Sequence, residues 1–178
     1  MRKLKVTELK RIDVLQFKAS EKTPLTVVLD DVRSMYNVGS VFRTADSFRL
    51  EKIMLCGITA CPPHPEIHKT ALGAELSMEW EKCENAVEAV KKLHEEGYEV
   101  YALEQVEHSV PLQNFNVEHG KKYALILGNE VKGVSQEAVN ICDGAIEIPQ
   151  IGTKHSMNVS VSGGIAMWQI ASQLLKLQ

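Results

Sequence analysis

The chain has 178 residues, of which 44% are hydrophobic and 24% are charged, and its formal net charge is −3 at pH 7. This composition is ordinary for one globular domain and excludes a disordered chain, while the negative charge argues against binding nucleic acid through bulk electrostatics. No run approaches the ~18 apolar residues of a membrane span. The charged amino terminus contains no apolar secretory segment, so we expect a cytoplasmic protein without membrane contact.

The amino-terminal segment is basic, although the chain as a whole is acidic. Residues 1–22 carry a net charge of +4, which leaves −7 on the remainder. A basic arm of this kind can contact phosphates. A helix docked on the protein body is the alternative, because apolar residues recur at helical spacing: Leu4, Leu9, Ile12 and Leu15. We therefore expect an arm or helix over residues 1–23 and a single domain over residues 24–178.

Short apolar runs alternate with helical patterns along the domain. The runs predict strands over residues 25–32, 52–58, 98–104, 121–129 and 144–149. A helix is predicted over 86–96, where Asn85 can cap the first turn and Gly97 can end the helix; a longer one is predicted within 158–176. Because the runs lack strict polar–apolar alternation, we predict an α/β domain with a mostly parallel sheet flanked by helices.

The cysteines and histidines do not form a recognisable metal or disulfide pattern. His64 and His68 lie near Cys61, but Pro65 opposes one regular helix through both histidines, and no second ligand cluster is present. We therefore expect no metal. Without a C-x-x-C pair or a secreted-domain framework, reduced thiols are expected for all four cysteines: Cys56, Cys61, Cys83 and Cys142.

Three polar segments follow predicted strands, where parallel sheets bind their ligands. The second segment is not a phosphate loop, since Val134 follows Gly133 where the phosphate-binding lysine is required. No G-x-G-x-x-G or G-x-S-x-G is present, which argues against a dinucleotide site, the common methyltransferase sheet and a serine hydrolase. The segments are NVGSVFRTADSF (37–48), LILGNEVKGVS (125–135) and IPQIGTKHSMNVSVSGGIA (148–166).

In order and spacing, these segments resemble the three motifs of the SpoU or TrmH-like RNA ribose 2′-O-methyltransferases of the SPOUT superfamily, over about residues 25–175. Met157 stands where leucine is usual, and Ser162, Gly163 and Gly164 replace an alanine-rich helix start. The resemblance implies a deep carboxyl-terminal trefoil knot over about 124–175, which general topology rules would not predict. It also implies S-adenosylmethionine as cofactor and a homodimer whose active site is shared between subunits.

The resemblance also implies catalytic roles for five residues. Arg43 would hold RNA phosphate and stabilise the reacting 2′-oxygen, because a guanidinium with a pKa above ~12 is a poor base but a good two-point ligand. Proton removal by Arg43 itself is the alternative. Asn37 would orient Arg43 or the ribose, Glu130 would be an electrostatic partner, and Ser156 and Asn158 would complete the polar group.

The cofactor is expected to bind mainly to backbone groups of the knot loops. The matching positions are Leu103, Glu104, Gly128, Ile148 and Met157. Taken singly, such residues are ordinary core or turn residues in most proteins. Their occurrence inside three motifs in register favours the functional interpretation.

The resemblance predicts methylation of tRNA rather than rRNA, because the chain shows no added domain for gripping ribosomal RNA. An rRNA 2′-O-methyltransferase is the alternative. A noncatalytic RNA-binding module is less favoured, since all five catalytic positions are retained. A small-molecule enzyme is the remaining alternative, favoured by the acidic body and by the shortage of aromatic side chains for stacking bases.

Overall fold

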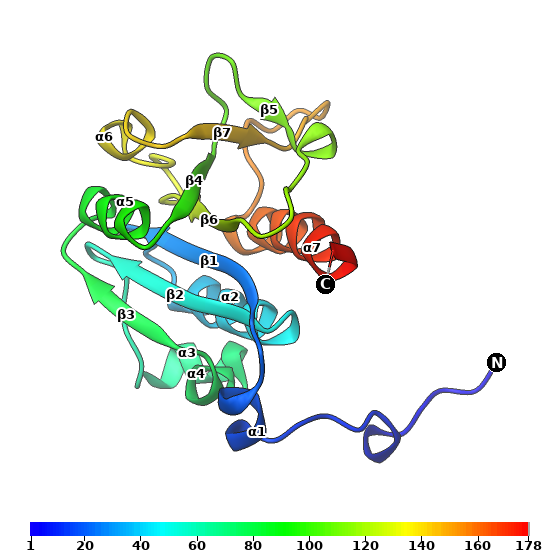
Figure 1. The fold of residues 1–178 in the computed structure, drawn as a ribbon. Helices are drawn as coiled ribbons and strands as arrows, with labels where there is room; N and C mark the ends of the chain where they lie inside the picture. The colour runs from blue at the N-terminus through cyan, green and yellow to red at the C-terminus, as the bar shows by residue number, and fades with distance from the viewer. Residues whose placement is uncertain (178) are drawn as a thin grey trace.

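In the computed structural model, which describes residues 1–177, seven strands form one sheet in the order β3-β2-β1-β6-β4-β7-β5 (Figure 1). Every adjacent pair of strands runs parallel, so the predicted parallel α/β fold is confirmed. The strands are β1 (Thr23–Asp30), β2 (Leu50–Cys56), β3 (Trp80–Cys83), β4 (Tyr98–Leu103), β5 (Val110–Pro111), β6 (Lys122–Leu127) and β7 (Gly144–Glu147). β3 and β5 were not predicted, because strands this short carry little periodicity.

The sheet is buried on both faces, as the uninterrupted apolar runs predicted. In β1, Val27 and Leu29 belong to one core cluster and Val28 to the other. The first cluster is covered by α2 (Met35–Ser47) and α7 (Val159–Leu177), with α3 (Pro65–Ala71) and α4 (Ala74–Ser77) beside α2. The second is covered by α5 (Ala86–Glu95) and α6 (Gln136–Val139). Both predicted helices are present, and the Asn85 side chain caps α5 by accepting from the Glu88 N–H at 2.9 Å.

The centre of the sheet is also the point where strand order changes direction. β1 pairs with β2 on one side and with β6 on the other, with Leu29 opposite both Leu55 and Leu127. The carboxyl ends of β1 and β6 are therefore neighbours, although 97 positions separate Asp30 from Leu127. In open α/β sheets, such a switch point leaves a crevice in which ligands bind.

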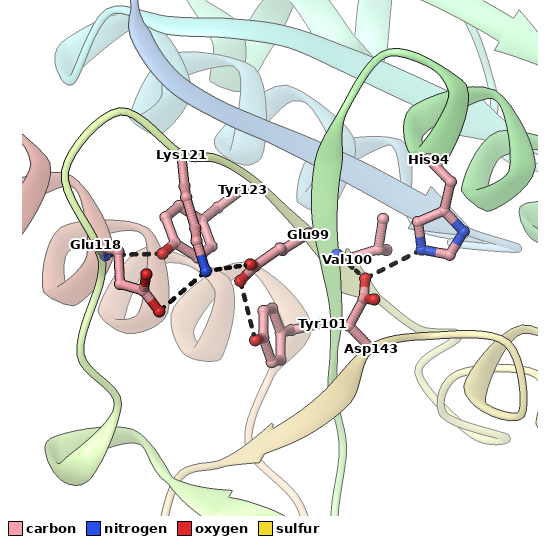
Figure 2. Close-up of polar contacts among 8 residues, drawn as sticks. All are labelled: His94, Glu99, Val100, Tyr101, Glu118, Lys121, Tyr123 and Asp143. Carbon is pink, nitrogen blue, oxygen red and sulfur yellow. Dashed lines mark hydrogen bonds and ion pairs between the residues drawn. The ribbon is translucent and has the colours of Figure 1, made fainter.

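Polar side chains connect the strands that reach this crevice at their other, amino-terminal ends (Figure 2). The Lys121 ammonium, just before β6, forms an ion pair of 2.6 Å with Glu99 on β4. Asp143, just before β7, accepts the Val100 N–H of β4 at 2.7 Å and contacts the His94 ring at 3.0 Å. These side-chain contacts join the starts of β4, β6 and β7, whose register is set by their backbone pairing.

The amino-terminal arm extends away from the domain (Figure 1). It contains one short turn of 3₁₀ helix, η1 (Val6–Glu8), and one short α-helix, α1 (Val14–Ala19), which docks through the buried Phe17. The single helix suggested by the apolar spacing is not formed, and the apolar side chains that suggested it are not buried against the domain. All four are exposed, from 41% for Leu9 and Ile12 to 78% for Leu15.

His64 and His68, the two histidines near Cys61, have structural partners. His64 caps α3, which begins at Pro65, by accepting the Glu66 N–H at 3.2 Å, and the His68 ring contacts Glu75. The four cysteines are free thiols, and burial raises the pKa of Cys142 to about 12. Within residues 1–177 no group of three or more His, Cys, Asp or Glu side chains is placed to hold a metal, and no helix is long and apolar enough to cross a membrane.

Candidate active site

A cavity of about 320 Å³ lies at the carboxyl ends of β4, β6 and β7. Three connecting segments form most of its wall, namely residues 103–105, 127–133 and 147–157. These segments belong to adjacent strands of the sheet, so distant parts of the sequence meet in one place. The cavity is lined by all five residues expected to bind the cofactor: Leu103, Glu104, Gly128, Ile148 and Met157.

Gly128 is required by the tight fold of one cavity wall. A Cβ atom at this position would lie 2.1 Å from both the carbonyl carbon of Gly133 and the nitrogen of Val134. The wall turns back here because Asn129 and Gly133 exchange two backbone hydrogen bonds of 2.9 Å. A glycine at 128 therefore shapes the cavity by allowing the backbone to pack against itself.

Carboxylates from the ends of β4 and β7 also line the cavity. Glu104 is held by two backbone donors, the Gln105 N–H at 2.9 Å and the Val134 N–H at 3.0 Å. Glu147 lines the same cavity, and its carboxylate has no hydrogen-bond or ion-pair partner among residues 1–177. Together with Glu130, these side chains give the cavity a negative character that suits a positively charged ligand.

Glu130 connects the cavity wall to the start of α2. Its carboxylate accepts the Arg33 and Ser34 N–H groups, each at 3.0 Å, and the side-chain amide of Asn37 at 2.9 Å. Burial alone would raise the pKa of Glu130, but these donors outweigh burial and hold the pKa below its ordinary value. The carboxylate is consequently ionised at neutral pH and fixes the orientation of Asn37.

Asn158 joins the same network from the start of α7. Its side-chain oxygen caps the helix by accepting the Ser160 N–H at 3.0 Å, while its amide donates to the Asn37 side-chain oxygen at 3.2 Å. The Ser160 hydroxyl also donates to Asn37, at 3.3 Å. Asn37, Glu130 and Asn158 thus form one connected polar group beside the cavity.

The other two predicted catalytic residues occupy different surroundings. Ser156 lines the cavity, is exposed, and has no side-chain hydrogen bond within the described part of the chain. Arg43 is exposed on the outer side of α2 and does not line the cavity of its own chain. No side-chain partner for Arg43 occurs in residues 1–177. Its guanidinium is therefore available for a ligand or for a second chain.

Several lining or supporting residues were not identified from the sequence. Asn129 donates to the Asp31 carbonyl at 2.7 Å and accepts the Val131 and Lys132 N–H groups, so its side chain shapes the turn. The sequence signal for this role was an asparagine that begins a turn ending in glycine, since asparagine side chains often bond to the backbone of such turns. Gln105 and Glu147 also line the cavity, and no local pattern marked them because both are ordinary polar residues at strand ends.

Comparison with known sequences places this arrangement in a family. A model of the SpoU rRNA Methylase family matches residues 24–168. The chain is 29% identical, over 96% of its length and 86% of the relative's, to a tRNA (guanosine(18)-2′-O)-methyltransferase of Thermus thermophilus. It is 27% identical, over 94% of its length and 67% of the relative's, to the 23S rRNA (guanosine-2′-O-)-methyltransferase RlmB of Vibrio parahaemolyticus.

Crystal structures of related proteins share the fold. The TrmH/SpoU tRNA modifying enzyme of A. aeolicus matches with a TM-score of 0.80 at 26% identity, over 96% of this chain and 84% of that one. The AdoMet-bound rRNA methyltransferase of Sinorhizobium meliloti matches with a TM-score of 0.78 at 26% identity, over 85% of this chain and 57% of that one. By its sequence motifs, its parallel sheet and the cavity at the strand ends, the chain belongs to the SpoU rRNA methylase family.

Proposed function

We propose that the protein transfers a methyl group from S-adenosylmethionine to a ribose 2′-hydroxyl of tRNA. The observation that carries this proposal is the polar group of Asn37, Glu130 and Asn158, which lies against a cavity lined by all five residues expected to bind the cofactor. The similar proteins named as RNA 2′-O-methyltransferases support the same reaction.

The cavity fits S-adenosylmethionine in size and charge. Its volume of about 320 Å³ falls within the usual range of ligand pockets, roughly 300–1,000 Å³. Glu104, Glu130 and Glu147 line it against one lysine, Lys132, which suits a donor carrying a sulfonium cation. The closely folded wall at Gly128 provides backbone groups, and Met157 provides apolar surface. An adenosine group requires both.

The bound cofactor supplies an electrophilic methyl group, and the residues of the chain position the acceptor. Glu130 accepts the Asn37 amide at 2.9 Å, and the Asn37 side-chain oxygen accepts the Asn158 amide at 3.2 Å. This network fixes both side chains beside the cavity where the reacting ribose would bind. Arg43 binds the neighbouring RNA phosphate and stabilises the developing 2′-oxyanion. The 2′-hydroxyl proton leaves to an RNA phosphate or to water, because a guanidinium is a poor proton acceptor.

Exposed cations around the cavity fit an RNA backbone. Arg33 follows β1 and donates its N–H to Glu130, and Lys132 lines the cavity two residues beyond Glu130. Both side chains are exposed and, like Arg43, have no acidic partner among residues 1–177. With Lys154 in the third segment, they supply local positive charge on an acidic protein.

We propose tRNA over rRNA as the substrate, with rRNA as the alternative. The relatives from Thermus thermophilus and Aquifex aeolicus are both named tRNA (guanosine(18)-2′-O)-methyltransferases, and the match spans 86% of the former. Methyl transfer to unmodified tRNA transcripts, to 23S rRNA fragments and to a small-metabolite extract tests the choice. Transfer only to rRNA would reverse the substrate assignment, and transfer only to metabolites would overturn the RNA assignment.

We propose a homodimer in which Arg43 of one subunit completes the cavity of the other. Arg43 lies outside the cavity of its own chain, next to an apolar surface on α7. Thr44 approaches Gly164 of α7, and Phe48 stacks against Trp168 at 5.5 Å. The exposed residues of α7 recur at helical spacing and form the proposed interface: Val161, Ile165, Trp168 and Leu175.

The knot and the arm belong to the same proposal. The likeness to the A. aeolicus structure over 96% of the chain supports the trefoil knot over about residues 124–175. We assign residues 1–23 to an arm that contacts RNA phosphates, because its cations and its exposed apolar residues extend away from the domain. An RNA substrate also agrees with the cytoplasmic location expected from the sequence.

A further inference from the structure

One wall of the cavity is held to the rest of the protein by very few contacts. Residues 149–157 connect β7 to α7, and all but Met157 are exposed. The side chain of Ile151 is fully in solvent. Yet this segment supplies four lining residues: Gln150, His155, Ser156 and Met157. Its position therefore shapes one wall of the cavity.

A single side chain ties this segment across the cavity. The Gln105 amide, at the end of β4, donates to the His155 carbonyl at 3.1 Å. Among residues 1–177, this is the one hydrogen bond between residues 149–157 and the remainder of the chain. Gln105 and His155 both line the cavity, so the bond joins two of its walls. The backbone of Gln105 is itself anchored, because its N–H donates to the Glu104 carboxylate at 2.9 Å.

We propose that Gln105 is a positioning residue that holds the 149–157 segment closed over the bound methyl donor. It acts through His155 on the adjacent Ser156 and Met157, which line the cavity. Loss of the amide leaves these residues on a segment without a long-range tether, which raises the rate at which the donor leaves. Because Gln105 acts on the wall of the cavity and not on the reacting atoms, its loss raises the KM for the methyl donor by a larger factor than it lowers kcat.

The role assigned to Gln105 concerns mainly how long S-adenosylmethionine stays bound, rather than the methyl-transfer step. One net hydrogen bond stabilises a protein by an amount equivalent to a roughly 2- to 10-fold change in an equilibrium. Gln105→Leu keeps the approximate size of the side chain but removes the hydrogen-bond donor. Gln105→Glu replaces this hydrogen-bond donor with a hydrogen-bond acceptor. Both variants should release S-adenosylmethionine about 2- to 10-fold faster and raise its KM by a larger factor than they lower kcat.

The test begins without any cofactor, so it does not depend on the proposed function. Trypsin cleaves after Lys154, which is exposed within the segment, and mass spectrometry follows the appearance of that cut in the unliganded protein. Cleavage should be about 2- to 10-fold faster in Gln105→Leu and in Gln105→Glu. The matched control is Gln113→Leu, an exposed glutamine in the same β4–β6 connection without a side-chain hydrogen bond in the described residues; it should behave as the wild type.

Stopped-flow measurement of S-adenosylmethionine release, with the thermal midpoint as a check on folding, completes the test. Unchanged cleavage at Lys154 in both Gln105 variants overturns the tether. Faster cleavage with unchanged donor release overturns its role in the site. If the wild-type protein does not bind S-adenosylmethionine, the assumption about function fails, whereas the cleavage rates still decide whether Gln105 restrains the segment.

Discussion

The Asn158 amide donates a 3.2 Å hydrogen bond to the side-chain oxygen of Asn37, across 121 positions of sequence. The bond joins the start of α7 to the first turn of α2, and Glu130 completes the connection from the cavity wall. Arg43 lies two turns further along α2. The network that orients the site therefore also fixes the helix that presents Arg43, which links the cavity to the proposed subunit interface.

Arg43→Ala should lower methyl transfer by on the order of 10²-fold or more, as expected for loss of a transition-state contact. S-adenosylmethionine affinity should stay nearly unchanged, because Arg43 does not line the cavity of its own chain. Arg43→Lys should restore little activity, since an ammonium lacks the planar two-point fork. Lys91→Ala on α5 controls for the lost charge. Near-normal activity of Arg43→Ala on a verified RNA substrate would remove Arg43 from the mechanism.

Mixing two inactive variants should restore activity if the site is shared between subunits. Arg43→Ala keeps an intact cavity, and Met157→Glu places a charge in the cavity wall but keeps Arg43. A mixed dimer contains one site with both an intact cavity and an intact arginine. Methyl transfer should therefore reappear on mixing, up to about half the activity of the wild-type dimer for each mixed dimer. If mixtures stay inactive although mixed dimers form, Arg43 acts within its own chain.

Ile165→Glu and Trp168→Glu should convert the proposed dimer to a monomer, because each places a charge among the exposed apolar residues of α7. Activity should fall with the dimer fraction in sedimentation velocity experiments. Ile58→Glu is the matched control, since Ile58 is a similarly exposed apolar residue, 66% against 55% for Trp168, on the loop after β2. An active monomer at assay concentrations would disprove the shared site.

Gly128→Val should abolish S-adenosylmethionine binding and also destabilise the protein. The added side chain would meet backbone atoms at 2.1 Å that cannot move without opening the Asn129–Gly133 turn. Calorimetry of binding and the thermal midpoint measure the two effects. Gly152→Ala is the control, because nothing lies within 4 Å of its added carbon. Unchanged affinity in Gly128→Val would exclude this cavity as the cofactor site.

Met157→Leu should bind S-adenosylmethionine about as tightly as the wild type. The change nearly conserves side-chain volume and introduces the leucine usual at this position of the family motif. Met157 is only partly buried and is not a core residue, so the core does not restrict the exchange. The same calorimetric titration measures the effect, and a loss of affinity above about tenfold would contradict a role based on shape alone.

Glu130→Gln should lower the free energy of unfolding at pH 7 by about 1.5–3 kcal/mol, the range for hydrogen bonds to a charged group. The donors of Arg33, Ser34 and Asn37 hold the pKa of Glu130 below 4.5, despite its burial. Because the folded pKa is depressed, the carboxylate stabilises the protein above about pH 4.5, and this contribution is lost as pH falls through the folded value. Urea unfolding should show the full difference at pH 7 and a progressively smaller one as the pH is lowered below 4.5. An equal difference throughout this range would contradict this account.

Local sequence patterns predicted much of the fold. Apolar runs such as residues 25–32 predicted strands buried on both faces, since hydrophobic periodicity reports which faces of an element are covered. Asn85 and Gly97 predicted the limits of α5 to within two residues, because helix caps are also local features of the sequence. The order of the three polar segments at strand ends predicted a site at the carboxyl edge of a parallel sheet. The resemblance carried by these segments supplied the individual residues.

Only the tertiary structure decided which of these segments meet. Strand order is set by long-range pairing, which leaves no local pattern in the sequence, so the contacts of Asn37 with Glu130 and Asn158 over 93 and 121 positions could not be predicted geometrically. For the same reason, the sequence did not predict the two-residue strand β5 or the exposure of the apolar residues of the arm. A sequence pattern does not reveal whether a complementary surface exists. Arg43 lies on the predicted helix, yet its exposure outside the cavity of its own chain follows from how α2 packs against the sheet and α7.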